Sequence, residues 1–535
     1  MVNLKDHYKR AIKTVLPAGI MISVMGPFSN NNPFPLNNTD TEIIADSSVT
    51  NSQLANYSLQ VDEFNPHWFG AIGDGKNDDT KGIQAAVNAA AVKGGTVVFP
   101  AGTYNVSQID LKSNVKLVGK KGAVLQSSSS RNQDFTMNAM GVSNFEVVDL
   151  VGSFNFNISN CSEFVIRNVK VTGNSQSWYF YESTNGSILN NQILNTKNTT
   201  ARIIYINKSS KMLVKGNLIK NKMLFNNVSP NLNTGINVSS SRYIQVMYNH
   251  VENCGGQGIL FDTNIGIAEP DERQCFSNIA FGNVVIGNGQ EGITAFSSNQ
   301  FETYDITISN NICINNRYDG IELWGVRQCI VEANRISASA MKEYSFGAIN
   351  ILAAKDIIVN SNSIDNVPNS GIATVKGSQY PEPECSNIII INNRIRNWNN
   401  LDLNPALNHD QNSGINLFGA EYSIVHGNII WDTKLGRKHP IKAIFVLQGR
   451  HLIGDNVNPG NLLIEDHQKV DQRWAMKRIA GHIPLLRMSQ LPGDIYNGNI
   501  SGIDSESLWY NHIKNAIYYK EHVKPMLVPT VIDGV

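Results

Sequence analysis

Net charge, cysteine and long apolar runs are what this 535-residue sequence has least of. Its 44 Lys and Arg balance 44 Asp and Glu, so no cationic field would gather nucleic acid. Six scattered cysteines are too few for a disulfide scaffold and lack zinc-like spacing. No stretch reaches the roughly 20 apolar residues that cross a bilayer. We therefore expect no nucleic-acid partner, no membrane span, no metal site and no cofactor.

The two ends of the chain differ from its middle. Lysines precede an apolar run at 15–25, whose length fits either a signal-peptide core or a short docking peptide. An Asn/Ser/Thr-rich stretch, typical of a linker, follows to about residue 60. Near the other end, "SESLWYNHIKNAIYYKEH" at 505–522 predicts a terminal helix. We divide the chain into an N-terminal segment or linker (1–62), a folded body (63–466) and a C-terminal capping or assembly region (467–535).

The body contains one repeated unit with insertions. The pattern Asn-x-apolar-x-Asn begins at residues 191, 217, 249, 362 and 393, with looser copies from Asn168, Asn283, Asn311, Asn334, Asn428 and Asn456. A Gly-Ile pair follows, and the Gly lies nine residues after the first Asn at 258, 292, 320 and 371. Alternating apolar runs precede the asparagines, so each unit predicts three short strands joined by turns.

Strands this short are stable only when coils stack and share one core. We therefore predict an all-β fold, a right-handed parallel β-helix of about 11 or more coils. Asparagine suits its turns because it tolerates the left-handed backbone region, and stacked amides can hydrogen-bond along the axis. Cys161, Cys275 and Cys385 fall where other units carry Ser, Thr or Ala, which indicates small buried turn residues.

A helix is expected at the front of the stack, within residues 78–95. Asp78 or Asp79 can cap it, Ile83 and Val87 form an apolar stripe, and Gly94-Gly95 ends it. A solenoid needs a cap over its open first coil, and this helix is the candidate.

The segment "FGAIGDGKNDDTKGIQAAVNAAAVKGGTVVFPAGTYNV" at 69–106 resembles the opening of the pectate-lyase-like β-helix superfamily. That superfamily includes lyases, hydrolases, epimerases and phage tailspike depolymerases, and "HWFGAIGDG" is similar to the entry of many tailspikes. The resemblance implies a polysaccharide substrate, an extracellular setting (secreted or on a phage tail) and a homotrimer. The acidic motif set of the polygalacturonases and an Asp cluster like the pectate-lyase calcium site are both absent, so no site residue is carried over.

Alternation in the strand after each Gly places its second and fourth residues outward. Glu322 is therefore expected to point to solvent. The same face would expose Phe296, Trp324 and Phe418, and aromatic faces beside amides and carboxylates suit sugar rings. A covering loop could equally bury these aromatics. We take as substrate-binding candidates Trp324, Phe296, Asn350, Thr294, Arg317 and Tyr318, in a groove walled by the long insertions.

Hydrolysis of a glycosidic bond needs one protonated and one ionised carboxyl group. The sequence offers two pairs: Asp262 with Glu322, two coils apart, or Glu291 with Asp319, which both precede a Gly and would stack on adjacent coils. Loop acids remain as further partners: Glu269, Asp271, Glu272, Glu302 and Asp305.

A polysaccharide lyase is the first alternative, because Arg317, Tyr318 and Arg327 lie nearby, with Arg273 and Tyr304 on loops. The outward strand positions carry no Lys, Arg or His, which favours hydrolysis. A non-catalytic glycan-binding spike is the second alternative. The sequence thus predicts an endo-acting glycoside hydrolase with catalytic candidates Glu322, Asp262, Glu291 and Asp319.

Overall fold

The computed structural model describes residues 63–466, together with short strands at 482–483 and 487–489. Within that range the description omits 129–133, 174–176, 197–201, 222–232, 340–345, 401–412, 434–441, 447–450, 455 and 458–462. The apolar run at 15–25 and the expected terminal helix at 505–522 lie outside the described residues. The three-part division of the chain stays a prediction.

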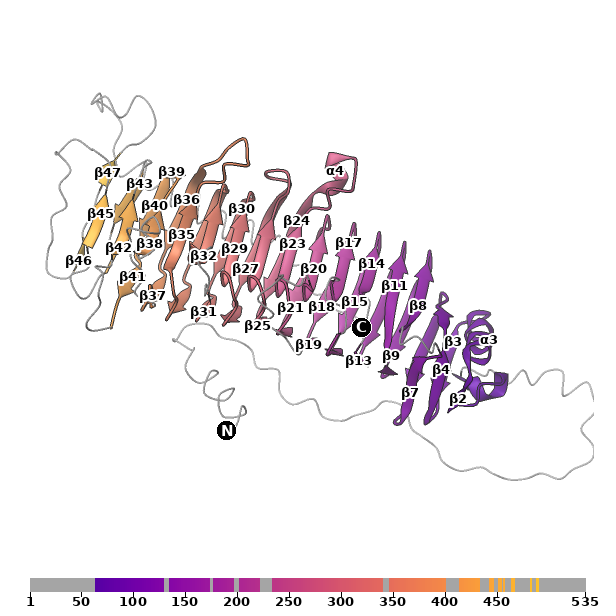
Figure 1. Ribbon diagram of the computed structural model, residues 1–535. Coiled ribbons are helices and arrows are strands. Elements are labelled where there is room, and N and C mark those ends of the chain that lie inside the picture. The colour runs from indigo at the N-terminus through magenta and orange to yellow at the C-terminus, as the bar shows by residue number, and fades with distance from the viewer. Residues whose placement is uncertain are drawn as a thin grey trace, which may run out of the picture. The chain divides into compact units, whose positions relative to one another are not determined.

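Three long sheets form the body, and successive coils add strands to them in turn (Figure 1). Sheet A has 17 strands, the first being β1 (Glu63–Phe64), and sheet B has 16, the first being β2 (Asp74–Asp78). All pairings are parallel except those of the last two strands, β46 (His482–Ile483) and β47 (Arg487–Ser489). The predicted right-handed parallel β-helix is therefore confirmed.

Sheet C contains the strands that follow the Gly-Ile signature. Its 14 strands are, in spatial order, β5 (Gln108–Asp110), β8 (Phe135–Met140), β11 (Phe154–Ser159), β14 (Trp178–Tyr181), β17 (Ile204–Asn207), β20 (Ile236–Ser239), β23 (Ile259–Asp262), β26 (Ile293–Phe296), β29 (Ile321–Trp324), β32 (Gly347–Leu352), β35 (Ser370–Val375), β38 (Ser413–Leu417), β42 (Lys442–Val446) and β45 (Leu463–Asp466).

The repeated asparagines form one buried ladder along the stack. In each step the side-chain Nδ2 donates to the Oδ1 of the next asparagine over 2.9–3.0 Å, and the backbone N–H donates to the same oxygen. The ladder comprises Asn191, Asn217, Asn249, Asn283, Asn311, Asn334, Asn362, Asn393, Asn428 and Asn456. Stacked amides thus satisfy buried turn groups in successive coils.

Asn168 is the exception to the predicted ladder. It adopts a left-handed backbone (φ 56°) and donates to Asp149, while the N–H of Val169 donates to Asn191 Oδ1. Asn168 therefore occupies the turn position one residue before the ladder, and the prediction that it starts the series was wrong.

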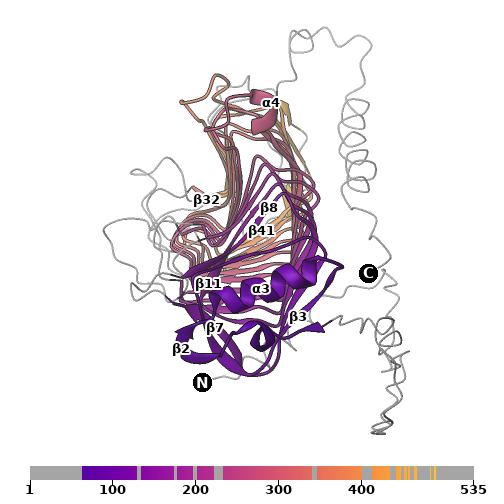
Figure 2. The ribbon, with the colours of Figure 1, turned by 90° about the vertical axis from the view of Figure 1, so that its right-hand side faces the viewer.

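The predicted cap is helix α3 (Thr80–Ala91), which lies across the first coil (Figure 2). Its own residues Ile83 and Val87 are fully buried. Asp78 Oδ1 accepts from the N–H of Thr80 at the helix start, whereas Asp79 accepts from the N–H groups of Ile72 and Gly73. The two acids thus fix the helix start and the incoming chain. All six cysteines are buried and free, as expected for Cys161, Cys275 and Cys385.

Candidate active site

Alternation along sheet C is as predicted, but Glu322 does not reach open solvent. Its neighbours Ile321 and Leu323 are fully buried in the core, so its side chain leaves the opposite face of β29. Even so, Glu322 is only 7% exposed. The expectation that it points to solvent was wrong, because its outward side chain is covered.

Glu291 and Asp319 lie on adjacent coils beside Glu322. Each immediately precedes the Gly that leads into its strand, β26 or β29, and the N–H of Gly292 donates to the carbonyl oxygen of Asp319 over 3.0 Å. Asp319 is 2% exposed and Glu291 is half-buried. The structure therefore brings together three of the four predicted catalytic acids, here called the carboxyl trio: Glu291, Asp319 and Glu322.

Mutual repulsion within the carboxyl trio changes how it binds protons. Burial, and then the charges of Glu291 and Asp319, raise the pKa of Glu322 well above its ordinary value of 4.5. Burial also raises the pKa of Glu291, opposed by hydrogen bonds from Gln257 and Thr294. The trio thus favours a proton on Glu322, whose pKa is raised both by burial and by the charges of its two neighbours.

Asn350 connects the trio from the next strand, β32. Its Nδ2 donates to Asp319 Oδ2 over 3.2 Å and lies 3.5 Å from Glu322 Oε1. Thr294, the register partner of Glu322 on β26, contacts Glu291. Both predicted binding residues therefore lie at the trio, and Asn350 hydrogen-bonds to its carboxyl groups.

Asp262, the fourth predicted acid, lies apart from the trio. The register aligns Glu322 with Leu260 rather than with Asp262, two coils away. Two coils and two residues separate the two acids by more than about 10 Å between their backbones. Asp262 instead accepts from Asn237 Nδ2 over 2.9 Å, and burial raises its pKa. The structure does not form the predicted pair of Asp262 with Glu322.

Aromatic side chains border the trio. Phe296 and Trp324 meet edge to face with ring centroids 5.2 Å apart, and both are half-buried, as is Phe418. Tyr380, from the loop after β35, donates its hydroxyl to Ser297 O over 2.5 Å. Burial and the charge of Glu322 raise the pKa of Tyr380, so this residue also lies near the trio.

Sequence reasoning missed Tyr380. Its loop is recognisable as an insertion, but nothing in the local sequence indicates that it returns to a coil 83 residues earlier.

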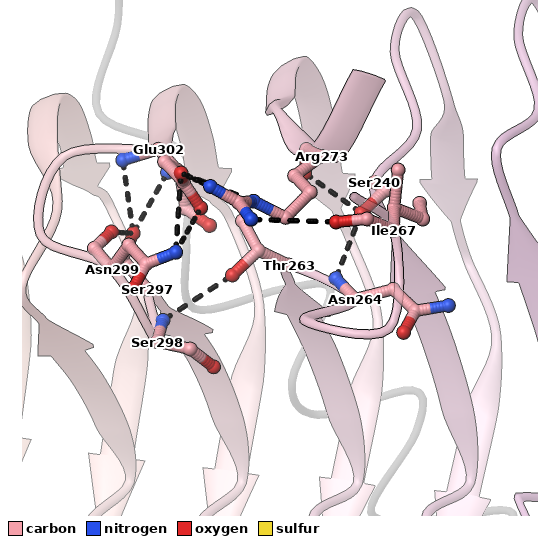
Figure 3. Close-up of polar contacts among 10 residues, drawn as sticks. Ser240, Thr263, Asn264, Ile267, Arg273, Ser297, Ser298, Asn299 and Glu302 are labelled. Carbon is pink, nitrogen blue, oxygen red and sulfur yellow. Dashed lines mark hydrogen bonds and ion pairs between the residues drawn. The ribbon is translucent and has the colours of Figure 1, made fainter. Parts of the chain in front are cut away.

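Three insertions join into one wall beside sheet C, which we call the loop wall: 263–274, 297–302 and 376–384. Arg273, at the end of the short helix α4 (Pro270–Arg273), pairs with Glu302 over 2.9 Å and links the first two loops (Figure 3). Gln300 exchanges hydrogen bonds with the backbone of Glu382 and links the second to the third.

The remaining candidates have varied surroundings. Arg317 and Tyr318 are half-buried just before Asp319. Arg327 stacks over Tyr304 at 4.1 Å on sheet A. Of the loop acids, Glu302 pairs with Arg273, Glu272 with Lys208, and Asp305 accepts from Ser277, while Glu269 and Asp271 lie at α4. Arg273 and Arg327 thus already serve structural contacts.

The described residues contain no group of three or more His, Cys, Asp or Glu side chains placed to hold a metal ion. None of the helices in this part of the chain is long and apolar enough to cross a membrane.

Comparisons with known proteins agree on the fold. The family model "Rhamnogalacturonase A/epimerase, pectate lyase-like" matches residues 64–268, and "Right handed beta helix region" matches 276–451. Over 66 residues the chain is 52% identical to mannuronan C5-epimerase AlgE3 and to alginate lyase 7, both of Azotobacter vinelandii. These matches cover 11% of this chain but only 4% and 8% of those proteins.

Two solved structures extend the likeness to most of the body. The A-module of mannuronan C-5 epimerase AlgE6 from Azotobacter vinelandii superposes with a TM-score of 0.50 at 17% identity, covering 74% of this chain and 99% of that one. The pre-mature gene product 12 of bacteriophage phi29 gives 0.57 at 14% identity, covering 79% and 58%. Such low identities establish the fold alone. The chain thus has the right-handed parallel β-helix fold, and its residues 64–268 match a pectate-lyase-like family model.

Proposed function

We propose that this chain is an endo-acting glycoside hydrolase that cleaves a polysaccharide lying along the outer face of sheet C. The observation that carries the proposal is the burial of Glu322 beside Glu291 and Asp319, with the Asn350 amide between Glu322 and Asp319. Glycosidases need a carboxyl group that stays protonated next to one that stays ionised. Here burial and like charges supply that difference within one cluster.

In this mechanism Glu322 is the general acid. It donates its proton to the oxygen of the departing sugar, while Glu291 and Asp319 provide the second carboxylate. That carboxylate either attacks the sugar carbon directly or activates a water, according to its separation from the acid. Asn350 holds Asp319 and Glu322 in register, and the faces of Trp324 and Phe296 can stack on sugar rings.

The names of similar proteins support a polysaccharide as the substrate. Mannuronan epimerases and an alginate lyase match one segment of this chain, and a phage protein shares its fold. We accordingly propose that the chain acts outside cells, as a secreted enzyme or on a phage tail. A homotrimer, implied by the tailspike resemblance, is part of the same proposal.

A lyase or epimerase is the second candidate, favoured by those names. Such enzymes need a group that neutralises a uronate carboxylate and a base near the C5 proton. Across β20–β38, the outward second positions carry Asn237, Leu260, Thr294, Glu322, Asn350, Ala373 and Asn416, with no Lys, Arg or His. Arg317 and Tyr318, which precede Asp319 in sequence, and Tyr380, which lies near Glu322, are groups that could serve instead.

Product chemistry separates these functions. The purified chain would be incubated with alginate, rhamnogalacturonan, α-1,3-glucan and bacterial capsular polysaccharides. New reducing ends without ultraviolet absorbance indicate hydrolysis, whereas absorbance from a new C=C bond indicates a lyase. Altered sugar signals in NMR spectra without chain shortening indicate an epimerase. Binding without any product would reject an enzymatic function and support a glycan-binding spike.

A further inference from the structure

The outward second positions of sheet C form one continuous row that leads from the carboxyl trio to a cluster of tyrosines. The register aligns Tyr179, Tyr205, Asn237, Leu260, Thr294 and Glu322 on successive strands from β14 to β29. Five strand spacings of about 4.8 Å place Tyr179 roughly 24 Å from Glu322 along the sheet.

The tyrosines form an aromatic platform at the far end of this row. Tyr179 and Tyr205 have ring centroids 5.1 Å apart, and Tyr181 stacks on Tyr179 at 5.9 Å. All three are half-buried, so part of each side chain remains accessible. The exposed guanidinium of Arg202 lies 4.4 Å from the centroid of the Tyr205 ring. We call this group the tyrosine platform: Tyr179, Tyr181, Tyr205 and Arg202.

Polar groups fix the edge of the platform nearer the trio. The Ser239 side chain hydrogen-bonds to both Tyr205 and Asp262, and Asn237 donates to Asp262 over 2.9 Å. This network explains why Asp262 is buried outside the trio. Between the platform and the trio the row is covered, because Asn237, Leu260 and Thr294 are 0%, 8% and 2% exposed, so the half-buried tyrosines are its accessible end.

We propose that the tyrosine platform is a remote subsite that holds a sugar ring of the polysaccharide several units away from the bond cleaved at the trio. The tyrosine rings stack on the C–H face of that sugar, and Arg202 donates hydrogen bonds to its oxygens. This inference rests on the proposed function for its substrate. It adds that the chain prefers long polymers, because only a long chain reaches both sites.

The test measures binding apart from cleavage. Affinity electrophoresis in gels containing alginate, rhamnogalacturonan or α-1,3-glucan would compare the wild-type chain with Tyr205→Ala. We expect the affinity for the retained polymer to fall roughly threefold to tenfold, the size of an aromatic stacking contribution. Tyr205→Phe keeps the ring and should retain the affinity. Tyr248→Ala is the matched control, because Tyr248 is 53% exposed and lies at the end of β21 (Gln245–Met247) in sheet A.

Cleavage assays on the same samples separate this proposal from the hydrolase proposal. If Tyr205→Ala weakens binding while the wild-type chain cleaves nothing, the subsite stands and the hydrolase fails. If the wild-type chain cleaves a polymer and Tyr205→Ala binds it equally well, the hydrolase stands and the subsite is overturned. Retention of none of the three polymers also overturns the subsite. Equal melting temperatures of the variants would exclude unfolding as the cause of weaker binding.

Discussion

The side-chain amide of Asn350 donates to Asp319 Oδ2 over 3.2 Å, from one coil to the coil before it. The same nitrogen lies 3.5 Å from Glu322 Oε1. One neutral donor thus lies between two buried acids that would otherwise repel each other at close range. This arrangement makes the carboxyl trio sensitive to protonation and to small changes in side-chain charge.

Replacing Glu322 by an amide that cannot ionise should stabilise the fold while it slows the reaction. Glu322→Gln keeps the shape but cannot release a proton on unfolding, which at neutral pH favours the unfolded wild type, so we expect a higher melting temperature at neutral pH. Loss of a general acid should lower the rate about 10²–10⁴-fold. Thermal denaturation and reducing-end assays on the same preparation check both effects. A variant that loses stability at neutral pH would contradict the raised pKa of Glu322.

The stability of the chain should depend on pH through Glu322. Because its folded pKa lies above the ordinary value of 4.5, the folded state binds more protons than the unfolded state between those two values. Its favourable contribution is therefore complete below about pH 4.5 and is lost as pH rises through the folded pKa. The melting temperatures of wild type and Glu322→Gln should agree at low pH and differ at higher pH. A difference in melting temperature that is the same at every pH would contradict the raised pKa of Glu322.

The pH dependence of the rate should reflect the same carboxyl group. Activity should fall as pH rises through the raised pKa of Glu322, because the acid must carry its proton. It should also fall in acid, where the second carboxylate becomes protonated. A bell-shaped profile of kcat/KM, with its upper limb above the range of an ordinary glutamate, is the expected outcome. Activity that keeps rising into alkaline solution would instead indicate a lyase-type base.

The asparagine ladder should contribute strongly to stability. Asn311→Ala removes the Oδ1 that accepts from both the backbone and the side chain of Asn283, and leaves these buried donors unpaired. We expect a loss of about 2–4 kcal/mol in the free energy of unfolding. Asn157→Ala, at an exposed outward position of β11, should change it by less than about 0.5 kcal/mol. Equal losses of unfolding free energy in Asn311→Ala and Asn157→Ala, measured by urea denaturation, would contradict a stabilising role of the asparagine ladder.

The stability of the loop wall should depend on the ion pair between Arg273 and Glu302. Arg273 and Glu302 are 17% and 15% exposed, and Arg273→Ala would leave Glu302 without its cation. A double-mutant cycle with Glu302→Ala should give a coupling of about 0.5–3 kcal/mol in the free energy of unfolding. Limited proteolysis should cut the 263–274 loop faster in Arg273→Ala. A coupling near zero would show that the two loops are held by their backbone contacts instead.

The fold was predictable because its determinants are local and repeated. Each ladder asparagine and each Gly-Ile strand contacts its equivalent in the next coil, so a spacing in sequence translates directly into a contact. The stacking of Glu291 on Asp319 followed from the same register. Asn168 was misplaced by one residue because an Asn in the turn and an Asn in the ladder look alike in sequence.

The surroundings of the site were less predictable. The burial of Glu322 is a tertiary property, and Tyr380, whose pKa is raised by burial and by the charge of Glu322, returns from a loop 58 residues further along. The separation of Asp262 from the trio depends on a two-residue offset along the strand, which a count of coils alone does not include. Loop contacts such as Gln300 with Glu382 join segments of unrelated sequence, so no periodic pattern reveals them.

The most direct test of the proposed hydrolase is reducing-end release from a cleaved polysaccharide by wild type, Glu322→Gln and Glu291→Gln, with Asp365→Asn as the control. Asp365 is an acid of sheet B that pairs with Arg396, away from the trio. We predict that both trio variants fold and lose most of the activity, while the control retains it. Full activity in both trio variants would contradict catalysis by the carboxyl trio.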